Sequence, residues 1–242
     1  MIADRVAAVR DRIARAAARV GRTAGEVTLV AVSKTHPPEA VREAFAAGVR
    51  DVGENRVQEA EGKTPALADL GAQGLRWHLV GHLQSNKAKK AAGLFDWVHS
   101  LDGAEIGRRV GEAAAAAGRE LRALVQVDLA GEKTKSGLEE AQLFPALESL
   151  RGLPAVKLLG LMTLPPYAED AEQARPYFQR LRALRDRARQ QGLIQGIELS
   201  MGMSHDLEVA VEEGATLVRV GTAIFGERGG LPSWAGPPRT GD

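Results

Sequence analysis

The sequence predicts a single α/β domain folded as a (β/α)8 TIM barrel with an extra N-terminal helix. Short apolar segments alternate with longer amphipathic segments along the chain, and eight of the apolar segments have the composition of strands. A length of 242 residues suits one barrel of this kind. No Gly/Ser-rich or Pro-rich linker divides the chain, which favours one domain over two.

The first expected element is a helix that precedes the barrel. Val6, Val9, Ile13 and Ala17 recur at steps of three and four residues, the spacing of one helix face. A nearly continuous β-branched run, VTLVAV at 27–32, is typical of a strand that is buried on both faces. Two prolines at 37–38 then open a helix that ends at Gly48.

The later elements follow the same alternation. Further strands are expected at 51–52, 77–80, 97–99, 123–128, 156–161, 197–199 and 217–220. Helices are expected between them at about 55–63, 86–92, 103–118, 138–149, 170–191 and 204–213. Strict alternation of this kind requires a parallel sheet, and eight units in this length favour closure into a barrel over an open sheet.

Composition excludes several classes of protein. Lys and Arg number 32 against 31 Asp and Glu, and this net charge of +1 argues against a nucleic-acid partner or a membrane surface. The absence of cysteine excludes disulfides, thiolate metal sites and a Cys nucleophile, and we expect no metal. The N-terminal segment is charged throughout and no apolar run is long enough to span a bilayer, so we expect a cytoplasmic protein.

Lys34 is the first candidate functional residue. Parallel barrel strands carry their functional groups at their C-terminal ends, and Lys34 follows the first strand while Asn55 follows the second. A lysine amine attacks an aldehyde when it is neutral, which burial or a neighbouring cation favours. The alternative is a solvated loop lysine beside Pro37.

Two later segments predict a phosphate site. In the segment LSMGMS (199–204), Ser200 and Ser204 offer hydroxyl donors and Gly202 allows close backbone approach, just before a helix N-terminus. Alternatively, Ser204 only caps that helix. Loops after the last two strands form the phosphate site of many barrels, and Gly221 and Thr222 follow the eighth strand.

Arg219 interrupts the apolar eighth strand and requires an acceptor, because a buried guanidinium without one costs several kcal/mol. A barrel carboxylate is one candidate acceptor, and a bound ligand is another. Lys34, the 199–204 loop and the end of the eighth strand together favour a phosphate-bearing aldehyde as that ligand.

These residues resemble those of the pyridoxal 5'-phosphate (PLP) homeostasis proteins, the proline-synthetase co-transcribed type, whose barrel is similar to the N-terminal domain of alanine racemase. The matching segments are AVSKTHP (31–37), GENRVQE (53–59), WHLVGHLQSNK (77–87), GLMTLPP (160–166), LSMGMSHD (199–206) and VRVGTAIFGER (218–228). They occur in the family's order and span almost the whole chain. Leu207 departs from the pattern where an aromatic residue is usual, and His205 occupies a variable position.

The resemblance implies the roles of particular residues. It implies that Lys34 carries PLP as a Schiff base, that Arg219 lies near the pyridine nitrogen and that Asn55 lies near the ring. It also implies that Ser200, Ser204, Gly221 and Thr222 hold the phosphate. The expected organisation is a PLP-binding barrel over residues 1–228 and a flexible C-terminal tail over 229–242.

The resemblance further implies a carrier or buffer of PLP, without catalytic residues, whose partners are PLP and apo-enzymes that need it. An arginine at the pyridine nitrogen can only donate a hydrogen bond, which weakens the ring as an electron sink. The alternative is a small amino-acid racemase or other PLP-dependent enzyme, with Lys34 and one of His82, His99, Tyr167 or His205 as its bases. A Schiff-base aldolase without a cofactor is a third possibility.

Overall fold

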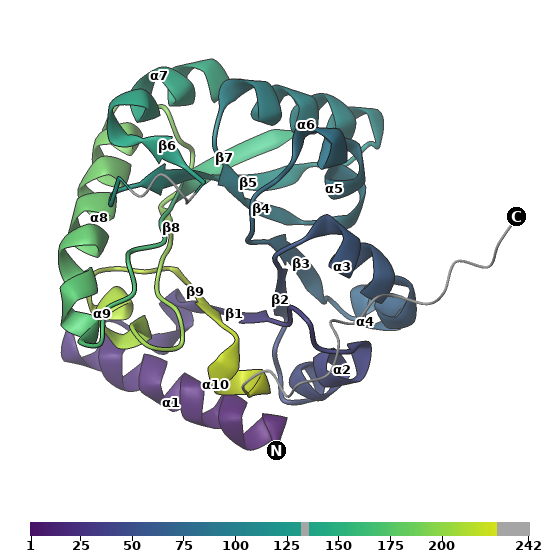
Figure 1. Cartoon of the computed structure of the whole chain (residues 1–242), viewed down its shortest axis with the longest axis vertical. Helices are drawn as coiled ribbons and strands as arrows, with labels where there is room; N and C mark the ends of the chain where they lie inside the picture. The colour runs from purple at the N-terminus through teal and green to yellow at the C-terminus, as the bar shows by residue number, and fades with distance from the viewer. Residues whose placement is uncertain (132–135, 227–242) are drawn as a thin grey trace, which may run out of the picture.

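Eight parallel strands close into a barrel in the computed structural model, which describes residues 1–131 and 136–226 (Figure 1). The order around the barrel is β4-β3-β2-β1-β9-β8-β7-β5, and pairing of β4 with β5 closes the ring. The fold class expected from the sequence is therefore confirmed. The barrel strands are β1 (Thr28–Val32), β2 (Asp51–Glu54), β3 (Arg76–Leu79), β4 (Trp97–Leu101), β5 (Leu121–Asp128), β7 (Val156–Met162), β8 (Glu198–Ser200) and β9 (Leu217–Val220).

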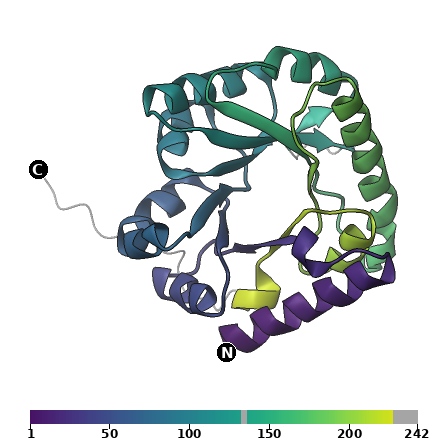
Figure 2. The same cartoon turned by 180° about the vertical axis from the view of Figure 1, so that it is seen from behind.

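Helices surround this barrel on its outer side (Figures 1 and 2). They are α1 (Ile2–Arg19), α2 (Pro38–Ala46), α3 (Val57–Lys63), α4 (Ala68–Ala72), α5 (Ala88–Leu94), α6 (Ala104–Ala116), α7 (Glu140–Leu150), α8 (Arg175–Gln190), α9 (Leu207–Glu212) and α10 (Thr222–Phe225). Short 3-10 turns occur at Ala24–Glu26, Pro65–Leu67, Ser85–Lys87 and Ala171–Ala174. Among the described residues, no helix is long and apolar enough to cross a membrane.

The extra helix α1 packs outside the barrel near the place where the last strand, β9, pairs with the first, β1. Its apolar face buries Val6, Val9 and Ile13, and it packs against α9 and α10, which flank the last strand (Figure 2). Burying a side chain of this size contributes about 1.5–3 kcal/mol. The helix therefore holds the α9–β9–α10 region in place from outside the barrel.

The barrel wall separates two hydrophobic cores. The larger core lies between the strands and the helices, and the smaller one fills the barrel interior with Val30, Val32, Val80, Leu124, Met162 and Leu217. The alternation of β1 explains the division, because Val30 and Val32 face inward while Ala31 faces the helices. Lys34 continues the inward-facing series and reaches the open end of the barrel.

Several local features differ from the sequence-based expectations. A two-residue strand, β6 (Leu138–Glu139), pairs with the end of β5 where a helix was expected to begin, and α7 starts only at Glu140. The helix expected from 204 begins at Leu207, since residues 204–206 form a turn. Helices α4 and α10 were not expected, because segments of four or five residues carry no clear period. The proposed tail over 229–242 lies outside the described residues.

Candidate functional site

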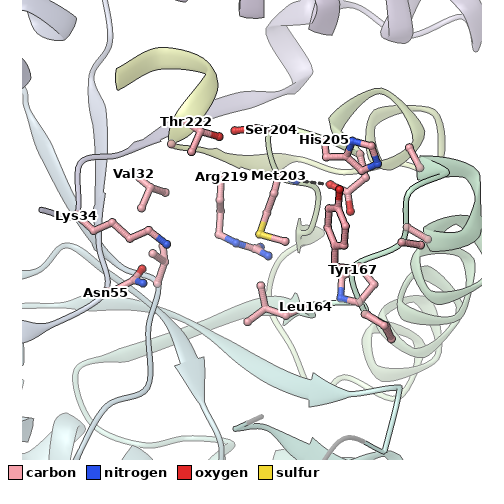
Figure 3. A pocket seen from close by; sticks show the side chains of 18 of the residues that line it. Val32, Lys34, Asn55, Leu164, Tyr167, Met203, Ser204, His205, Arg219 and Thr222 are labelled. Carbon is pink, nitrogen blue, oxygen red and sulfur yellow. Dashed lines mark hydrogen bonds between the residues drawn. The ribbon is translucent and has the colours of Figure 1, made fainter. Parts of the chain in front are cut away.

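A pocket of about 560 Å³ opens at the C-terminal ends of the barrel strands. The loops after β1, β2 and β3 form one wall, and the loops after β8 and β9 form another. The segment between β7 and α8 lines the remaining side with Leu164, Tyr167 and Ala171 (Figure 3). Residues far apart in the sequence thus meet in one cavity, as expected for this face of a barrel.

Lys34 lies half-buried on one side of the pocket, and its amine extends beside Asn55 (Figure 3). Among the described residues, its side chain has no hydrogen-bond or ion-pair partner. The following residue, Thr35, has a φ of 66°, which is uncommon for a β-branched residue. The Thr35 N–H donates to Glu59 Oε2 of α3 at 2.9 Å, so α3 stabilises the turn that presents the amine.

A buried ion pair between Lys63 and Glu54 contacts the residue that precedes Lys34. Lys63 Nζ, fully buried, donates to the Ser33 carbonyl at 2.7 Å and to Glu54 Oε1 at 2.6 Å. The Ser33 hydroxyl also donates to Glu54 Oε1, whereas the buried Glu54 Oε2 has no partner. Burial raises the pKa of Glu54 to about 7, against the opposing effects of Lys63 and Ser33. This buried cluster therefore holds Ser33 on one side of Lys34, while Glu59 holds Thr35 on the other.

The loop after β8 forms the opposite end of the pocket. Gly202 has a φ of 90°, and a Cβ there would lie 2.5 Å from the Cβ of Ala210, so the loop requires glycine. The Ser204 hydroxyl accepts a hydrogen bond from the Ala223 N–H at 3.3 Å, which joins this loop to α10. From outside, Arg12 of α1 donates to the Ser204 carbonyl at 3.0 Å and forms two bonds to Glu208. The loop bearing Ser204 is thus fixed on two sides.

Arg219 projects from β9 into the pocket between Lys34 and Tyr167 (Figure 3). Its Nη1 donates to Ser200 Oγ at 2.6 Å, and its Nη2 donates to the Thr163 carbonyl at 2.9 Å. Burial lowers its pKa to about 10, while the nearby Asp206 carboxylate acts in the opposite direction. Arg219 therefore remains charged near neutral pH, and it is held by neutral acceptors without direct contact to a carboxylate among the described residues.

Two aromatic rings stand at the pocket mouth. Tyr167 is 80% exposed, and its ring lies 5.5 Å from the His205 ring at a tilt of 40°. Met203 and Leu164 add apolar surface between these rings and Arg219 (Figure 3). Leu164 and Met203 therefore give this part of the pocket an apolar surface.

Most residues proposed from the sequence line the pocket, namely Lys34, Asn55, Ser204, Arg219, Gly221 and Thr222. Ser200 and Gly202 do not line it. Ser200 is fully buried, and its hydroxyl lies between Arg219 and His99. Gly202 lies behind the loop, where its carbonyl accepts the Arg219 N–H at 2.9 Å. Ser200 thus contacts Arg219 instead of facing the cavity.

Sequence reasoning missed the apolar side of the pocket and the support of Lys34. The Pro165-Pro166 pair shortly after β7 could have indicated this side, because prolines favour an extended segment at the barrel mouth. Lys63 carried no such signal, because a lysine on a short helix is usually exposed. Among the described residues, no three His, Asp or Glu side chains group to hold a metal ion.

The fold and site define a (β/α)8 barrel with a lysine in the pocket at its C-terminal face. Comparison with known proteins identifies the family to which this barrel belongs. The family model described as "Alanine racemase, N-terminal domain" matches residues 5–229. A pyridoxal phosphate homeostasis protein of Pseudomonas aeruginosa is 48% identical over 229 residues, covering 94% of this chain and 96% of the relative. One from Aquifex aeolicus is 47% identical over 200 residues, covering 83% and 86%. The chain therefore belongs to the family of pyridoxal phosphate homeostasis proteins.

Solved structures agree with this assignment. PipY of Synechococcus elongatus, solved with PLP bound, is 42% identical with a TM-score of 0.83, covering 93% of this chain and all of that one. An alanine racemase of Clostridium difficile has a TM-score of 0.68 at 14% identity, over 84% of this chain and 56% of that one. The second comparison shows a shared barrel fold and nothing finer.

Proposed function

We propose that the pocket holds PLP as a Schiff base on Lys34, and that the protein acts in PLP homeostasis as a carrier or buffer. One observation carries the proposal: an unpaired lysine amine shares a single cavity with Arg219 and with the hydroxyls of Ser204 and Thr222. These groups suit a flat, anionic aldehyde, because they offer one amine nucleophile and several hydrogen-bond donors. The relative solved with PLP supports the choice of ligand.

PLP, when bound, supplies an aldehyde that condenses reversibly with a primary amine. The residues of this chain divide the work of holding it. Lys34 provides the amine, Asn55 lies beside the ring, and Arg219 donates toward the pyridine nitrogen. Donors to the phosphate come from Ser204, Gly221 and Thr222, while Gly202 keeps their loop close and Ser200 holds Arg219 from behind.

Arg219 favours reversible binding of the cofactor over catalysis with it. A guanidinium has donors and no acceptor, so it leaves the ring nitrogen unprotonated and the ring a weak electron sink. Chemistry that requires a carbanion next to the imine is slow under these conditions. We therefore expect this protein to bind and release PLP with little turnover of amino acids, and to pass the cofactor to apo-enzymes.

A small amino-acid racemase is the second candidate, because Tyr167 and His205 stand at the mouth as candidates for a second base. Exchange of the α-hydrogen of L- and D-amino acids for deuterium separates the two functions. The carrier should exchange no faster than free PLP at equal concentration. It should also activate an apo-enzyme at a rate set by PLP release. Exchange well above the free-PLP rate would establish an enzyme.

The absorbance spectrum tests cofactor binding itself. The pure protein reconstituted with PLP should show a visible imine band that borohydride removes. A protein that lacks this band, and that instead forms a reducible adduct with carbonyl substrates, would be a cofactor-independent aldolase.

A further inference from the structure

A chain of hydrogen bonds crosses the barrel interior from its N-terminal end to the pocket. At the far end Asp51, the first residue of β2, accepts from His78 Nε2 at 2.8 Å. His78 Nδ1 lies 2.9 Å from His99 Nε2, and His99 Nδ1 lies 2.8 Å from Ser200 Oγ. Ser200 Oγ accepts from Arg219 at 2.6 Å. Four hydrogen bonds thus connect Asp51 to the guanidinium in the pocket.

The direction of this chain is fixed by chemistry. Burial lowers the pKa of both His78 and His99, so both imidazoles are neutral and each has one donor and one acceptor. The Asp51 carboxylate only accepts, so His78 carries its proton on Nε2 and accepts on Nδ1. His99 must then donate from Nε2 and accept the Ser200 hydroxyl on Nδ1. Every donor in the chain therefore points toward Asp51.

This chain of hydrogen bonds is unusual for the interior of a barrel. Barrel interiors are mainly filled by branched apolar side chains, and the interior cluster that includes Val30, Val32 and Leu124 follows that rule. His78, His99 and Ser200 are nevertheless fully buried, and each of the polar side-chain atoms in the chain has a partner. The Trp97 ring stacks on His78 at 5.5 Å and 7°, which fixes the imidazole plane. A buried polar network in which every hydrogen-bonding group has a partner holds its side chains in one arrangement.

Asp51 is anchored where the chain reaches the surface. Arg76 of β3 donates to both of its oxygens, at 2.7 and 2.6 Å, and the Arg76 side chain is 48% exposed. One end of the chain is therefore held by a charged pair open to solvent. The other end is the buried Arg219, which has no carboxylate in direct contact among the described residues.

We propose that Asp51, His78, His99 and Ser200 are positioning residues that fix Arg219 and set the strength with which it donates to a ligand in the pocket. Hydrogen bonds that all run in one direction polarise each other, so the Asp51 charge makes Ser200 Oγ a stronger acceptor for Arg219. The guanidinium charge is thereby partly balanced by a carboxylate it does not touch. The expected effect on PLP rests on the proposed function. The direction of the hydrogen bonds from Arg219 to Asp51 does not depend on it.

The first experiment uses the protein without cofactor. Nitrogen-15 NMR of the histidine side chains reports which ring nitrogen carries the proton. The chain requires the Nε2–H tautomer for both His78 and His99, with slowly exchanging ring protons. An Nδ1–H tautomer, or a charged imidazole, at either residue near neutral pH would overturn the proposal. This result holds or fails whether or not the protein binds PLP.

The second experiment measures the imine pKa by absorbance in the PLP-loaded protein. Asp51→Asn keeps an acceptor for His78 and removes the charge, so Arg219 should act more strongly on the ring. We expect the imine to bind its proton about threefold more weakly. Ser200→Ala, which cuts the chain at Arg219, should have a larger effect.

Glu213→Gln is the matched control, because Glu213 is also buried and ion-paired, but with Arg175 and Arg182 outside the barrel. It should leave the imine pKa unchanged. Equal imine pKa values in Asp51→Asn and Glu213→Gln proteins would overturn the proposal. Failure of the wild type to form any imine would instead reject the proposed function and leave the NMR result standing.

Discussion

Asp51 and Glu54 lie three residues apart on β2 and face opposite sides of the barrel wall, and their pKa values are shifted in opposite directions. Burial alone raises the pKa of Asp51, but hydrogen bonds from His78 and Arg76 outweigh it and lower the pKa to about 2. Burial raises the pKa of Glu54 to about 7. The difference follows from the donors, because both Asp51 oxygens are bonded whereas Glu54 Oε2 has none.

The comparison shows that donor placement, more than depth, decides what a buried carboxylate does here. Asp51 is a fixed negative charge that can anchor the chain toward Arg219. Glu54, whose pKa is raised to about 7, pairs with Lys63 and holds the turn that bears Lys34. Strand β2 thus supports the pocket at two places. A charged carboxylate acts toward Arg219, and a carboxyl with a raised pKa acts at the Lys34 turn.

Replacement of Lys63 should produce the largest change. Lys63→Met leaves Glu54 buried without its counter-ion, and breaking such a pair costs about 3–5 kcal/mol of unfolding free energy. Arg42→Met is the control, because its pair with Asp69 is exposed and such pairs contribute at most about 1 kcal/mol. Urea denaturation above the pKa of Glu54 measures both. Equal losses in the two variants would show that the Glu54 cluster does not support the fold.

The pH dependence of stability should separate the two carboxylates. The contribution of Glu54 is complete below its unfolded value of 4.5 and is lost as pH rises through about 7. Relative to Glu54→Gln, the wild type should lose about 3 kcal/mol between about pH 4 and about pH 8. Constant relative stability of these two proteins over that range would reject a raised pKa for Glu54.

Asp51 should show the reverse dependence. Its contribution is present above its unfolded value of 3.8 and is lost as pH falls toward about 2. The advantage of the wild type over Asp51→Asn should therefore shrink by about 2 kcal/mol across that acidic range. An advantage that stays constant from neutral pH into this range would mean that Asp51 is not held by its donors.

Weakening the outer support of the 202–206 loop should have the smallest effect. Arg12→Ala removes the bonds to the Ser204 carbonyl and to Glu208, and we expect a loss of about 1 kcal/mol, seen as a several-fold weaker PLP affinity. Arg15→Ala is the control, since Arg15 lies on the same helix but pairs with Asp11 in solvent. Affinity would be measured by fluorescence titration. Equal affinities in the two variants would show that α1 does not act on this loop.

The sequence was sufficient to predict the barrel and most of the pocket. Strand composition located all eight barrel strands, and the rule that parallel strands end at one face brought Lys34, Asn55, Ser204, Arg219 and Thr222 together. Both predictions use features that are local in the sequence. Neither requires knowledge of how far one strand is shifted against the next.

Contacts that depend on register could not be predicted in this way. His78, His99 and Ser200 lie on β3, β4 and β8, and their contacts follow from the stagger and tilt of strands around the barrel. The same dependence placed Ser200 behind Arg219 and not in the cavity. Lys63 was missed because only the packing of α3 on β2 shows that its amine is buried.

Covalent mapping of the cofactor tests the central claim most directly. Protein loaded with PLP is reduced with borohydride, digested, and analysed by mass spectrometry. The pyridoxyl group should be found on the peptide that carries Lys34, and Lys34→Ala protein should give no such adduct while retaining weak, phosphate-held PLP. A modified peptide carrying Lys133 or Lys135, which lie outside the described residues, or an undiminished adduct in Lys34→Ala protein, would contradict the claim.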